Sequence, residues 1–210
     1  MLFVALAFLA GSVPFGVLVA RRRGVNIQER GSGNIGATNV ARVLGKAPAL
    51  LVLLLDGAKA AAPTYLALRL GHAPQVVAAV AFAAILGHCF SPWLRFRGGK
   101  GVACAIGVYL VISPMFSAVV IGVFVVVLAL TRVPALGSAV GVWVMAALLT
   151  LYRSPPFAAL GLATAVLILF THRSNWRQLA ARRASARTGA GRQAPAEGRD
   201  QPAGPGATGT

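Results

Sequence analysis

Long apolar runs alternate with short polar segments over most of this chain. An α-helix rises about 1.5 Å per residue, so about 20 apolar residues cross the ~30 Å hydrocarbon core of a bilayer. The pattern predicts seven spanning helices, over residues 2–20, 47–70, 74–90, 102–112, 115–130, 134–151 and 155–171. The fourth is short, about 16 Å at that rise, and Pro114 separates it from the fifth. We therefore expect residues 1–183 to form an all-α, polytopic integral membrane domain.

The last part of the chain has a different composition. From about residue 184 it consists mainly of Ala, Gly, Pro, Arg and Gln, without apolar periodicity. Such a segment buries too little apolar surface to fold on its own. We therefore expect residues 184–210 to form a disordered cytoplasmic tail, with arginines placed to contact anionic lipid headgroups.

Basic residues are concentrated in every second connection between the predicted spans. Segment 21–46 carries Arg21, Arg22, Arg23, Arg30, Arg42 and Lys46, and segment 91–101 carries Arg95, Arg97 and Lys100. Loops rich in Lys and Arg stay in the cytoplasm, so seven spans place the N-terminus outside and the C-terminus in the cytoplasm. This distribution accounts for the net charge of +16 without a nucleic acid partner. A hydrophobic fraction of 57% and a mean hydropathy of +0.75 exclude a soluble domain.

The chain offers few groups for metal or acid–base chemistry. It has four acidic residues, and two of them, Glu197 and Asp200, lie in the predicted tail. The other two, Glu29 and Asp56, are too few for a Mg²⁺ site built from carboxylates. No histidine is followed by an aspartate five positions later, which excludes the commonest acyltransferase dyad, and the two cysteines show no metal or redox spacing. We expect neither a metal nor a cofactor.

A glycine-rich polar segment follows the first predicted span, from Arg30 to Arg42. Its glycines, Gly31, Gly33 and Gly36, let the backbone turn sharply and point several N–H groups at one anion, and the two arginines add positive charge. The spacing also matches the dinucleotide-binding pattern G-x-G-x-x-G, but no strand precedes it and no βαβ unit fits. The segment therefore indicates a phosphate site at a membrane surface.

A second glycine-rich segment surrounds Lys100, with Gly98, Gly99 and Gly101 beside it at the start of the fourth span. A helix N-terminus attracts anions, so this segment can form another phosphate site. It is not a Walker loop, because Leu94 stands at the first glycine position and Gly101 at the Ser/Thr position. An ordinary basic surface loop would explain the arginines of this segment but not three glycines around one lysine.

The last span ends in a third polar segment, which contains His172 and Asn175. Residues three apart share a helix face, so both side chains can point into one pocket; a histidine here can also be an ordinary interfacial hydrogen-bonding residue.

Asp56 and Lys59 are likewise three apart, within the second span. An unpaired charge at mid-bilayer costs about 2.5–3.5 kcal/mol, so we favour a structural ion pair over a direct contact with substrate. Ser138, taken alone, is typical of a helix-cap or packing hydroxyl.

Together these segments resemble the bacterial acyl-phosphate:glycerol-3-phosphate acyltransferase family. The matching sequences are GSGNIGATNVAR (31–42), GHCFSPWLRFRGGKGVA (87–103) and HRSNWRQL (172–179), with DGAK (56–59) and TRVPALGS (131–138) in agreement. The resemblance covers the whole span region and leaves out the tail. One difference is that Ala181, Arg182 and Arg183 follow the third motif, where the family usually has a Gly-x-Glu element.

The resemblance implies that the 1-hydroxyl of sn-glycerol 3-phosphate attacks the carbonyl of a fatty acyl phosphate. The products are lysophosphatidic acid and phosphate, in the first acylation of phospholipid synthesis. It implies a donor-phosphate site of Gly33, Asn34, Gly36, Thr38 and Ser138, and a glycerol 3-phosphate site of Ser32, Arg42, Lys100, His172 and Asn175. Lys100, His172 and Asn34 would be the catalytic residues, with Lys100 bridging both phosphates. The general base would be either His172 or the departing phosphate.

The resemblance also implies a multi-pass enzyme of the bacterial inner (plasma) membrane, surrounded by lipid, with its active site facing the cytoplasm. A soluble phosphate:acyl-carrier-protein transacylase would be a partner that supplies the donor. The alternative from another class is a membrane transporter for a small organic anion. Such a transporter needs polar groups on both membrane faces and near the midplane, whereas here they converge on one face. A membrane scaffold would leave the glycine-rich segments unexplained.

Overall fold

The computed structural model describes the backbone of residues 1–187 and the side chains of residues 1–181. It divides into two units, Met1–Ser174 and a second that begins at Asn175. Helix α10 (Arg173–Arg187) continues past residue 184, where we expected the disordered tail to begin. The rest of that predicted tail, residues 188–210, lies outside the described residues.

The described residues form helices and no strands, which confirms the predicted all-α class. The helices before α10 are α1 (Leu2–Ser12), α2 (Phe15–Arg21), α3 (Ala37–Leu44), α4 (Lys46–Arg69), α5 (Pro74–Cys89), α6 (Val102–Ile112), α7 (Pro114–Thr131), α8 (Pro134–Tyr152) and α9 (Pro155–Thr171), with short 3-10 helices η1 (Ile27–Glu29) and η2 (Pro92–Leu94). Helices α5, α7, α8 and α9 each begin at a proline. Proline suits the first helical position because it needs no N–H partner there.

The described helices support a protein that crosses the membrane several times. Five helical segments within residues 1–187 are long and apolar enough to span a bilayer, and α9 with α10 makes a sixth if that bent pair is one span. Helix α6 has 11 residues and is shorter, as predicted for the fourth span. The exact count of seven stays a prediction.

The first predicted span is present as one apolar segment, Leu2–Arg21, but it consists of two helices, α1 and α2, with a break at Val13 and Pro14 that the hydropathy pattern did not reveal. Pro14 has no N–H to donate and disrupts the helix before it. Backbone groups that are released inside a bilayer need other partners. Ser91 Oγ donates to the Ser12 carbonyl (2.7 Å), and Lys59 Nζ donates to the Val13 carbonyl (2.6 Å). Polar side chains from distant parts of the chain thus stabilise the break.

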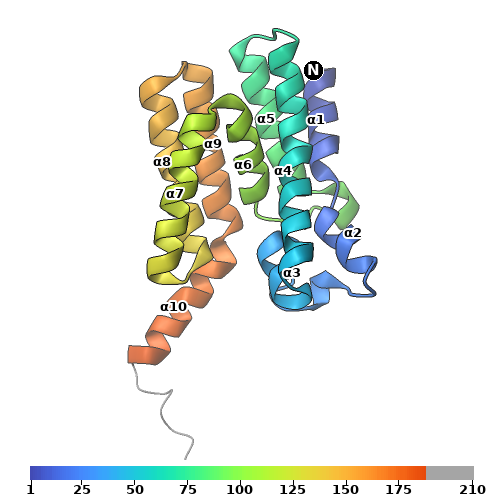
Figure 1. The fold of residues 1–210 in the computed structure, drawn as a ribbon, viewed down its shortest axis with the longest axis vertical. Helices are drawn as coiled ribbons and strands as arrows, with labels where there is room; N and C mark the ends of the chain where they lie inside the picture. Colours follow the sequence, from blue (N-terminus) through green and yellow to red (C-terminus); the bar gives the residue numbers. More distant parts are fainter. Residues whose placement is uncertain (188–210) are drawn as a thin grey trace, which may run out of the picture. The chain divides into compact units, whose positions relative to one another are not determined.

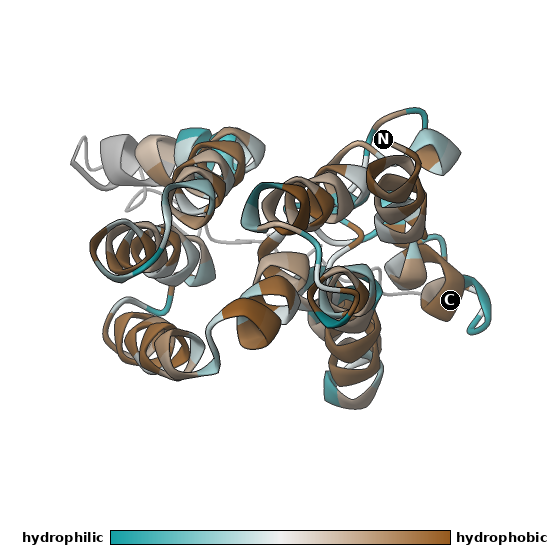
Figure 2. Ribbon diagram, turned by 90° about the horizontal axis from the view of Figure 1, so that it is seen from above, coloured by the Kyte–Doolittle hydropathy of each residue, from teal (hydrophilic) through white to brown (hydrophobic). Residues whose placement is uncertain are grey.

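Close helix contacts organise the first unit. Helix α1 packs along α5, α4 along α6, and α8 along α7 and α9, while α5 also contacts α9 (Figure 1). Figure 2 shows from above that most of the helical residues are hydrophobic. A Cβ at Gly107 of α6 would collide with the Gly57 carbonyl of α4, and a Cβ at Gly87 of α5 would collide with the Phe8 carbonyl of α1. Small residues at such crossings let membrane helices approach closely.

Arg153, in the turn between α8 and α9, forms hydrogen bonds at the C-terminal end of the short α6. It donates from Nε to Ser113 Oγ (3.1 Å) and from Nη2 to the Ile112 carbonyl (3.0 Å). A cation at a helix C-terminus binds carbonyls that lack an intrahelical partner and complements the helix dipole. The contact therefore ties the α6–α7 turn to the α8–α9 turn.

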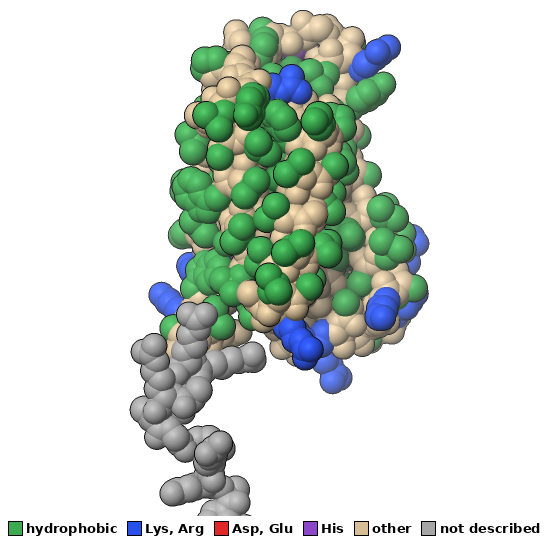
Figure 3. Space-filling model, turned by 60° about the vertical axis from the view of Figure 1, so that its left-hand side comes forward, with side chains coloured by type: hydrophobic (Ala, Val, Ile, Leu, Met, Phe, Trp, Pro, Cys, Tyr) green, Lys and Arg blue, Asp and Glu red, His purple; other side chains and the backbone are tan. Residues whose placement is uncertain are grey.

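The outer surface of the first unit is largely apolar. Figure 3 shows one face, on which hydrophobic side chains cover the middle and Lys and Arg side chains lie toward the ends. The exposed side chains of α7 include Met115, Val125 and Leu130, and Ser117 is its one buried residue. An apolar surface of this extent is unfavourable in water and indicates contact with lipid.

Candidate active site

Within the first unit, the polar segments lie toward the end that carries α2 and α3, opposite the N-terminus (Figure 1). Thr171 Oγ1, at the end of α9, donates to the Lys100 carbonyl (3.0 Å). Arg42, in α3, lies close enough for its charge to lower the pKa of Lys100. Lys100 in turn lies close enough to lower the pKa of His172. The structure therefore brings together three predicted site residues from three distant motifs.

Asn39 organises the first polar segment from the first turn of α3, where it is almost fully buried. Its Oδ1 accepts a hydrogen bond from the Ser32 N–H (2.8 Å). Its Nδ2 donates to the carbonyls of Arg30 (3.0 Å), Asn34 (2.9 Å) and Ile27 (3.4 Å). The motif contains Asn39, but motif chemistry alone gave it no role. The sequence did contain one indication of this role: an asparagine at the start of a short helix can bond the backbone of the glycine-rich loop that precedes it.

Two glycines of this loop have backbone conformations that other residues rarely adopt. Gly31 and Gly33 have φ angles of +61° and +69°. A Cβ at Gly31 would collide with Asn39 Oδ1, and a Cβ at Gly33 would lie 2.9 Å from the Gln28 carbonyl. Glycine is therefore required at both positions for the loop to close around the Asn39 amide.

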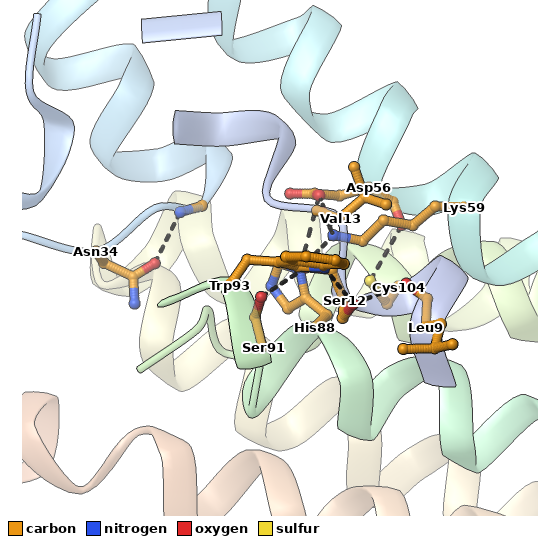
Figure 4. Close-up of polar contacts among 11 residues, drawn as sticks. Leu9, Ser12, Val13, Asn34, Asp56, Lys59, His88, Ser91, Trp93 and Cys104 are labelled. Atoms are coloured by element: carbon orange, nitrogen blue, oxygen red, sulfur yellow. Dashed lines mark hydrogen bonds and ion pairs between the residues drawn. The ribbon is translucent and has the colours of Figure 1, made fainter. Parts of the chain in front are cut away.

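The loop ends at Gly36, the residue that precedes α3. Asn34 Oδ1 accepts a hydrogen bond from the Gly36 N–H (2.9 Å; Figure 4). The Asn34 oxygen is thus engaged within the protein, so Nδ2 is the group that Asn34 can offer to a ligand. Within the described chain no side chain caps the start of α3, and such a helix terminus attracts anions. Ser32 and Thr38 are exposed beside it.

Lys100 lies half-buried just before α6. Burial lowers the pKa of its ammonium, and the charge of Arg42 lowers that pKa further. The Gly99 N–H donates to the His88 carbonyl (3.0 Å), which anchors the backbone immediately before the lysine. Two cations that share a partly dry region repel each other, and a bound anion relieves that repulsion.

His172 follows the last residue of α9, and its side chain is buried. Its Nδ1 is 2.8 Å from the Ile168 carbonyl, which can only accept a hydrogen bond, so Nδ1 carries the proton of the neutral ring. Burial lowers the pKa of His172 to about 4; the hydrogen bond to Ile168 opposes this shift and the charge of Lys100 adds to it. The ring is therefore neutral near pH 7, with Nε2 as a hydrogen-bond acceptor.

We expect His172 to make the stability of the fold depend on acidity. Its ordinary pKa is 6.5 and its pKa in the folded protein is about 4, so the unfolded chain binds more protons between these values. The contribution of neutral His172 to the free energy of unfolding should be fully present above the ordinary pKa and be lost as the pH falls toward 4. The measurement is the thermal unfolding midpoint of the purified protein from pH 4 to 7.5. His172→Gln should flatten the profile in that interval, and an equal slope in both proteins would contradict the lowered pKa.

The prediction that His172 and Asn175 share a helix face was wrong. Helix α9 ends at Thr171 and α10 begins at Arg173, so His172 stands at a break between two helices. Its N–H and its Nδ1 both lie within hydrogen-bond distance of the Ile168 carbonyl (3.0 and 2.8 Å), which closes α9 at this point. Asn175 lies in the second unit, and its contribution to the site stays a prediction.

Ser138 is buried in the first turns of α8, where its Oγ donates to the Pro134 carbonyl (3.0 Å). Helix α8 packs against α7 and α9. Among residues 1–187, no hydrogen bond joins Ser138 to the loop around Asn39. Its role in donor binding stays a prediction.

Asp56 and Lys59 form the structural ion pair that their spacing predicted. Lys59 Nζ lies 2.7 Å from Asp56 Oδ1, and both side chains are buried. In the part of the chain that the structure describes, no group of three or more His, Cys, Asp or Glu side chains could hold a metal ion. That the reaction proceeds without a metal stays a prediction.

Known proteins match most of the chain. A family model described as Glycerol-3-phosphate acyltransferase matches residues 1–182. A relative named glycerol-3-phosphate acyltransferase from Myxococcus xanthus is 48% identical over 182 residues, which cover 85% of this chain and 95% of the relative. A relative of the same name from Geobacter sulfurreducens is 42% identical over 180 residues, which cover 85% and 93%.

Solved structures match the fold as well. The crystal structure of PlsY (YgiH), an integral membrane glycerol 3-phosphate acyltransferase, in its glycerol 3-phosphate form has a TM-score of 0.83 and 32% identity, with 87% of this chain and 92% of that chain covered. Its lysophosphatidic acid form has a TM-score of 0.81 with the same identity and coverage. These matches give no support to the anion transporter considered above, because the proteins are named as acyltransferases.

Proposed function

This chain belongs to the glycerol-3-phosphate acyltransferase family, and we propose that it transfers a fatty acyl group from an acyl phosphate to the 1-hydroxyl of sn-glycerol 3-phosphate. The chain is a multi-pass membrane enzyme. The observation that carries the proposal is the grouping of Arg42, Lys100 and His172 at the end of the unit where Asn39 orders a glycine-rich loop. Cations and backbone N–H groups suit a reaction in which both substrates carry phosphates.

Two neighbouring phosphate sites bind the substrates. Glycerol 3-phosphate is bound by Ser32, Arg42, Lys100 and His172, and the donor phosphate by Gly33, Asn34, Gly36, Thr38 and Ser138. The proximity of Lys100 to both Arg42 and His172 supports the first site. The uncapped start of α3, next to Gly36, supports the second. Lys100 contacts both phosphates.

The reaction needs no protein nucleophile, because an acyl phosphate is an activated mixed anhydride. The hydroxyl oxygen on C1 of glycerol 3-phosphate bonds to the acyl carbonyl carbon. The bond from that carbon to the phosphate oxygen breaks, and phosphate leaves with the electron pair. Lys100 stabilises the negative charge that develops on the leaving group.

The hydroxyl proton passes to the departing phosphate or to Nε2 of His172. A pKa of about 4 makes His172 a weak base. This supports transfer to the phosphate, with His172 holding the hydroxyl in place through a hydrogen bond to Nε2. His172 then positions glycerol 3-phosphate and does not serve as the general base.

The choice of acyl donor tests the proposed function directly. Purified protein should form lysophosphatidic acid from palmitoyl phosphate and labelled glycerol 3-phosphate, and none from palmitoyl-CoA when no soluble transacylase is present. The described chain has short connections between its helices and no added domain to hold a nucleotide carrier. The acyl chain can instead enter from the lipid, where burying each CH₂ contributes about 0.8 kcal/mol. Product from palmitoyl-CoA alone, or none from palmitoyl phosphate in folded protein, would overturn the proposal.

We also propose seven crossings, with the N-terminus outside and the active site on the cytoplasmic side of a bacterial inner membrane. The basic loops between the helices support this orientation, because they are retained in the cytoplasm. A soluble phosphate:acyl-carrier-protein transacylase would then deliver the donor from the cytoplasm.

Thiol labelling in intact cells tests this orientation. In a variant with Cys89 and Cys104 replaced by alanine, we expect Arg97→Cys and Ser174→Cys to be protected from a membrane-impermeant thiol reagent, and His72→Cys to react. All three positions are exposed, so protection reflects the membrane and not burial. Reaction of position 97 in intact cells would place the Lys100 loop outside and contradict the orientation.

A further inference from the structure

Three ionisable side chains form a buried cluster that the proposed reaction does not use. Asp56 and Lys59 pair across one turn of α4, and His88 lies opposite them in α5 (Figure 4). Nδ1 of His88 is 3.0 Å from Lys59 Nζ and 3.6 Å from Asp56 Oδ1. All three side chains are almost fully buried. Ionisable groups within spanning helices are costly, and their presence there suggests a function.

The cluster is fixed on several sides. Lys59 Nζ also donates to the Val13 carbonyl at the break between α1 and α2 (2.6 Å). The Cys104 thiol of α6 donates to the Asp56 carbonyl (3.1 Å). The ion pair therefore holds the Nδ1 edge of the His88 ring, because a rotation of the ring breaks its contact with Lys59.

The other edge of the ring faces the backbone that leads to Lys100. The Gly99 N–H donates to the His88 carbonyl (3.0 Å). A Cβ at Gly99 would collide with Nε2 of the His88 ring, so the Gly99 backbone lies directly against the ring. Gly98 has a different neighbour, because a Cβ there would collide with the backbone carbonyl of His88.

We propose that His88 is a positioning residue for acyl transfer: its ring, held by Asp56 and Lys59, sets the path of the Gly99 backbone and thereby the position of Lys100. The proposal rests on the proposed role of Lys100 in the reaction. His88 acts through the loop and does not touch either substrate. The Nε2 edge of the ring is in steric contact with Gly99, and the Nδ1 edge makes polar contacts with Lys59 and Asp56. A substitution can therefore alter one edge and leave the other.

A double-mutant cycle tests the contact between His88 and Gly99. Gly99→Ala adds a methyl group that collides with the ring, and we expect it to lower kcat by more than about tenfold. His88→Ala removes the ring and should lower kcat by a smaller factor. The double variant should have the kcat of His88→Ala alone, because the added methyl group then meets no ring. Failure of His88→Ala to rescue Gly99→Ala would overturn the proposal.

Gly98→Ala is the matched control. Its added methyl group meets the carbonyls of His88 and Cys89, which His88→Ala leaves in place. The activity of Gly98→Ala should therefore gain nothing from His88→Ala. Equal rescue of Gly98→Ala and Gly99→Ala would indicate general loosening of the loop and would also overturn the proposal.

A second variant keeps the experiment informative if His88→Ala does not fold. His88→Asn retains a polar group near the position of Nδ1 and removes the Nε2 edge, so it should hold the contact with Lys59 and still rescue Gly99→Ala. Its thermal unfolding midpoint should stay near that of the wild type, which separates positioning from stability. No rescue of Gly99→Ala in a folded His88→Asn background would overturn the proposal.

Lys100→Ala, measured in the same assay, separates the two hypotheses. If Lys100→Ala keeps full activity, the proposed function of Lys100 fails, and the role of His88 in acyl transfer fails with it. If Lys100→Ala is inactive and the cycle shows no coupling, the proposed role of Lys100 stands and the positioning role of His88 is wrong.

Discussion

Replacement of Lys100 by alanine is expected to lower kcat roughly 100- to 10,000-fold. One ammonium is proposed to bind two phosphates through charge-assisted hydrogen bonds of about 1.5–3 kcal/mol each, and about 1.4 kcal/mol is tenfold in rate. The half-buried position of Lys100 strengthens these contacts by excluding part of the water. The measurement is initial-rate kinetics of the purified variant with palmitoyl phosphate and saturating glycerol 3-phosphate.

Two further variants sharpen this experiment. Lys46→Ala removes an exposed lysine at the start of α4, so its kcat should stay within about twofold of the wild type. Lys100→Arg keeps the charge but replaces a compact ammonium by a planar guanidinium, so it should recover only part of the activity. Wild-type kinetics for Lys100→Ala in folded protein would rule out its place in the site.

Asn39→Ala is expected to lower kcat/KM by roughly 100-fold, although Asn39 is not proposed to touch either substrate. The amide of Asn39 holds the N–H of Ser32 and the carbonyls of Arg30 and Asn34. Each buried polar group left without a partner costs about 1–3 kcal/mol, so the loop should lose the conformation that presents its N–H groups to phosphate. Steady-state kinetics with either substrate varied should show the loss.

Asn26→Ala is the matched control for this prediction. Asn26 precedes η1, and its Oδ1 accepts one hydrogen bond, from the Gln28 N–H (3.3 Å), at an exposed position. Its removal should change kcat/KM by less than about threefold, because water replaces an exposed hydrogen bond. Similar losses in both variants would show that the loop tolerates no change of any kind, and Asn39 would then have no special role.

The helices were largely predictable, because apolar runs in this chain are bounded by prolines and polar loops. The short fourth helix, Val102–Ile112, was predicted at both ends, and the predicted starts at Pro74, Pro134 and Pro155 were also correct. The grouping of Arg42, Lys100 and His172 followed from the same pattern. Helices that alternate in direction bring every second loop to the same end.

What the sequence did not reveal depends on contacts between distant residues. A hydropathy pattern is the same for a straight helix and a broken one, so the break before Pro14 was missed. The partners of the break are distant in sequence: Lys59 lies in α4, and Ser91 follows α5. The role of Asn39 depends on which side of a short helix faces the loop. His88 and Gly99 belong to the same sequence motif, but the motif does not show that the side chain of one lies against the backbone of the other.

The break between α1 and α2 also constrains the order in which the protein assembles. Lys59 lies 46 residues after Val13, and Ser91 lies 79 residues after Ser12. The ribosome therefore delivers the first apolar segment to the membrane before either side chain has been synthesised. Pro14 breaks the helix from the start, and carbonyls without partners in hydrocarbon cost several kcal/mol each, so we expect the break to be stabilised only when Lys59 and Ser91 have been inserted beside it. The first span is thus the earliest part of the protein to be synthesised, and we expect it to be among the last to reach its stable form.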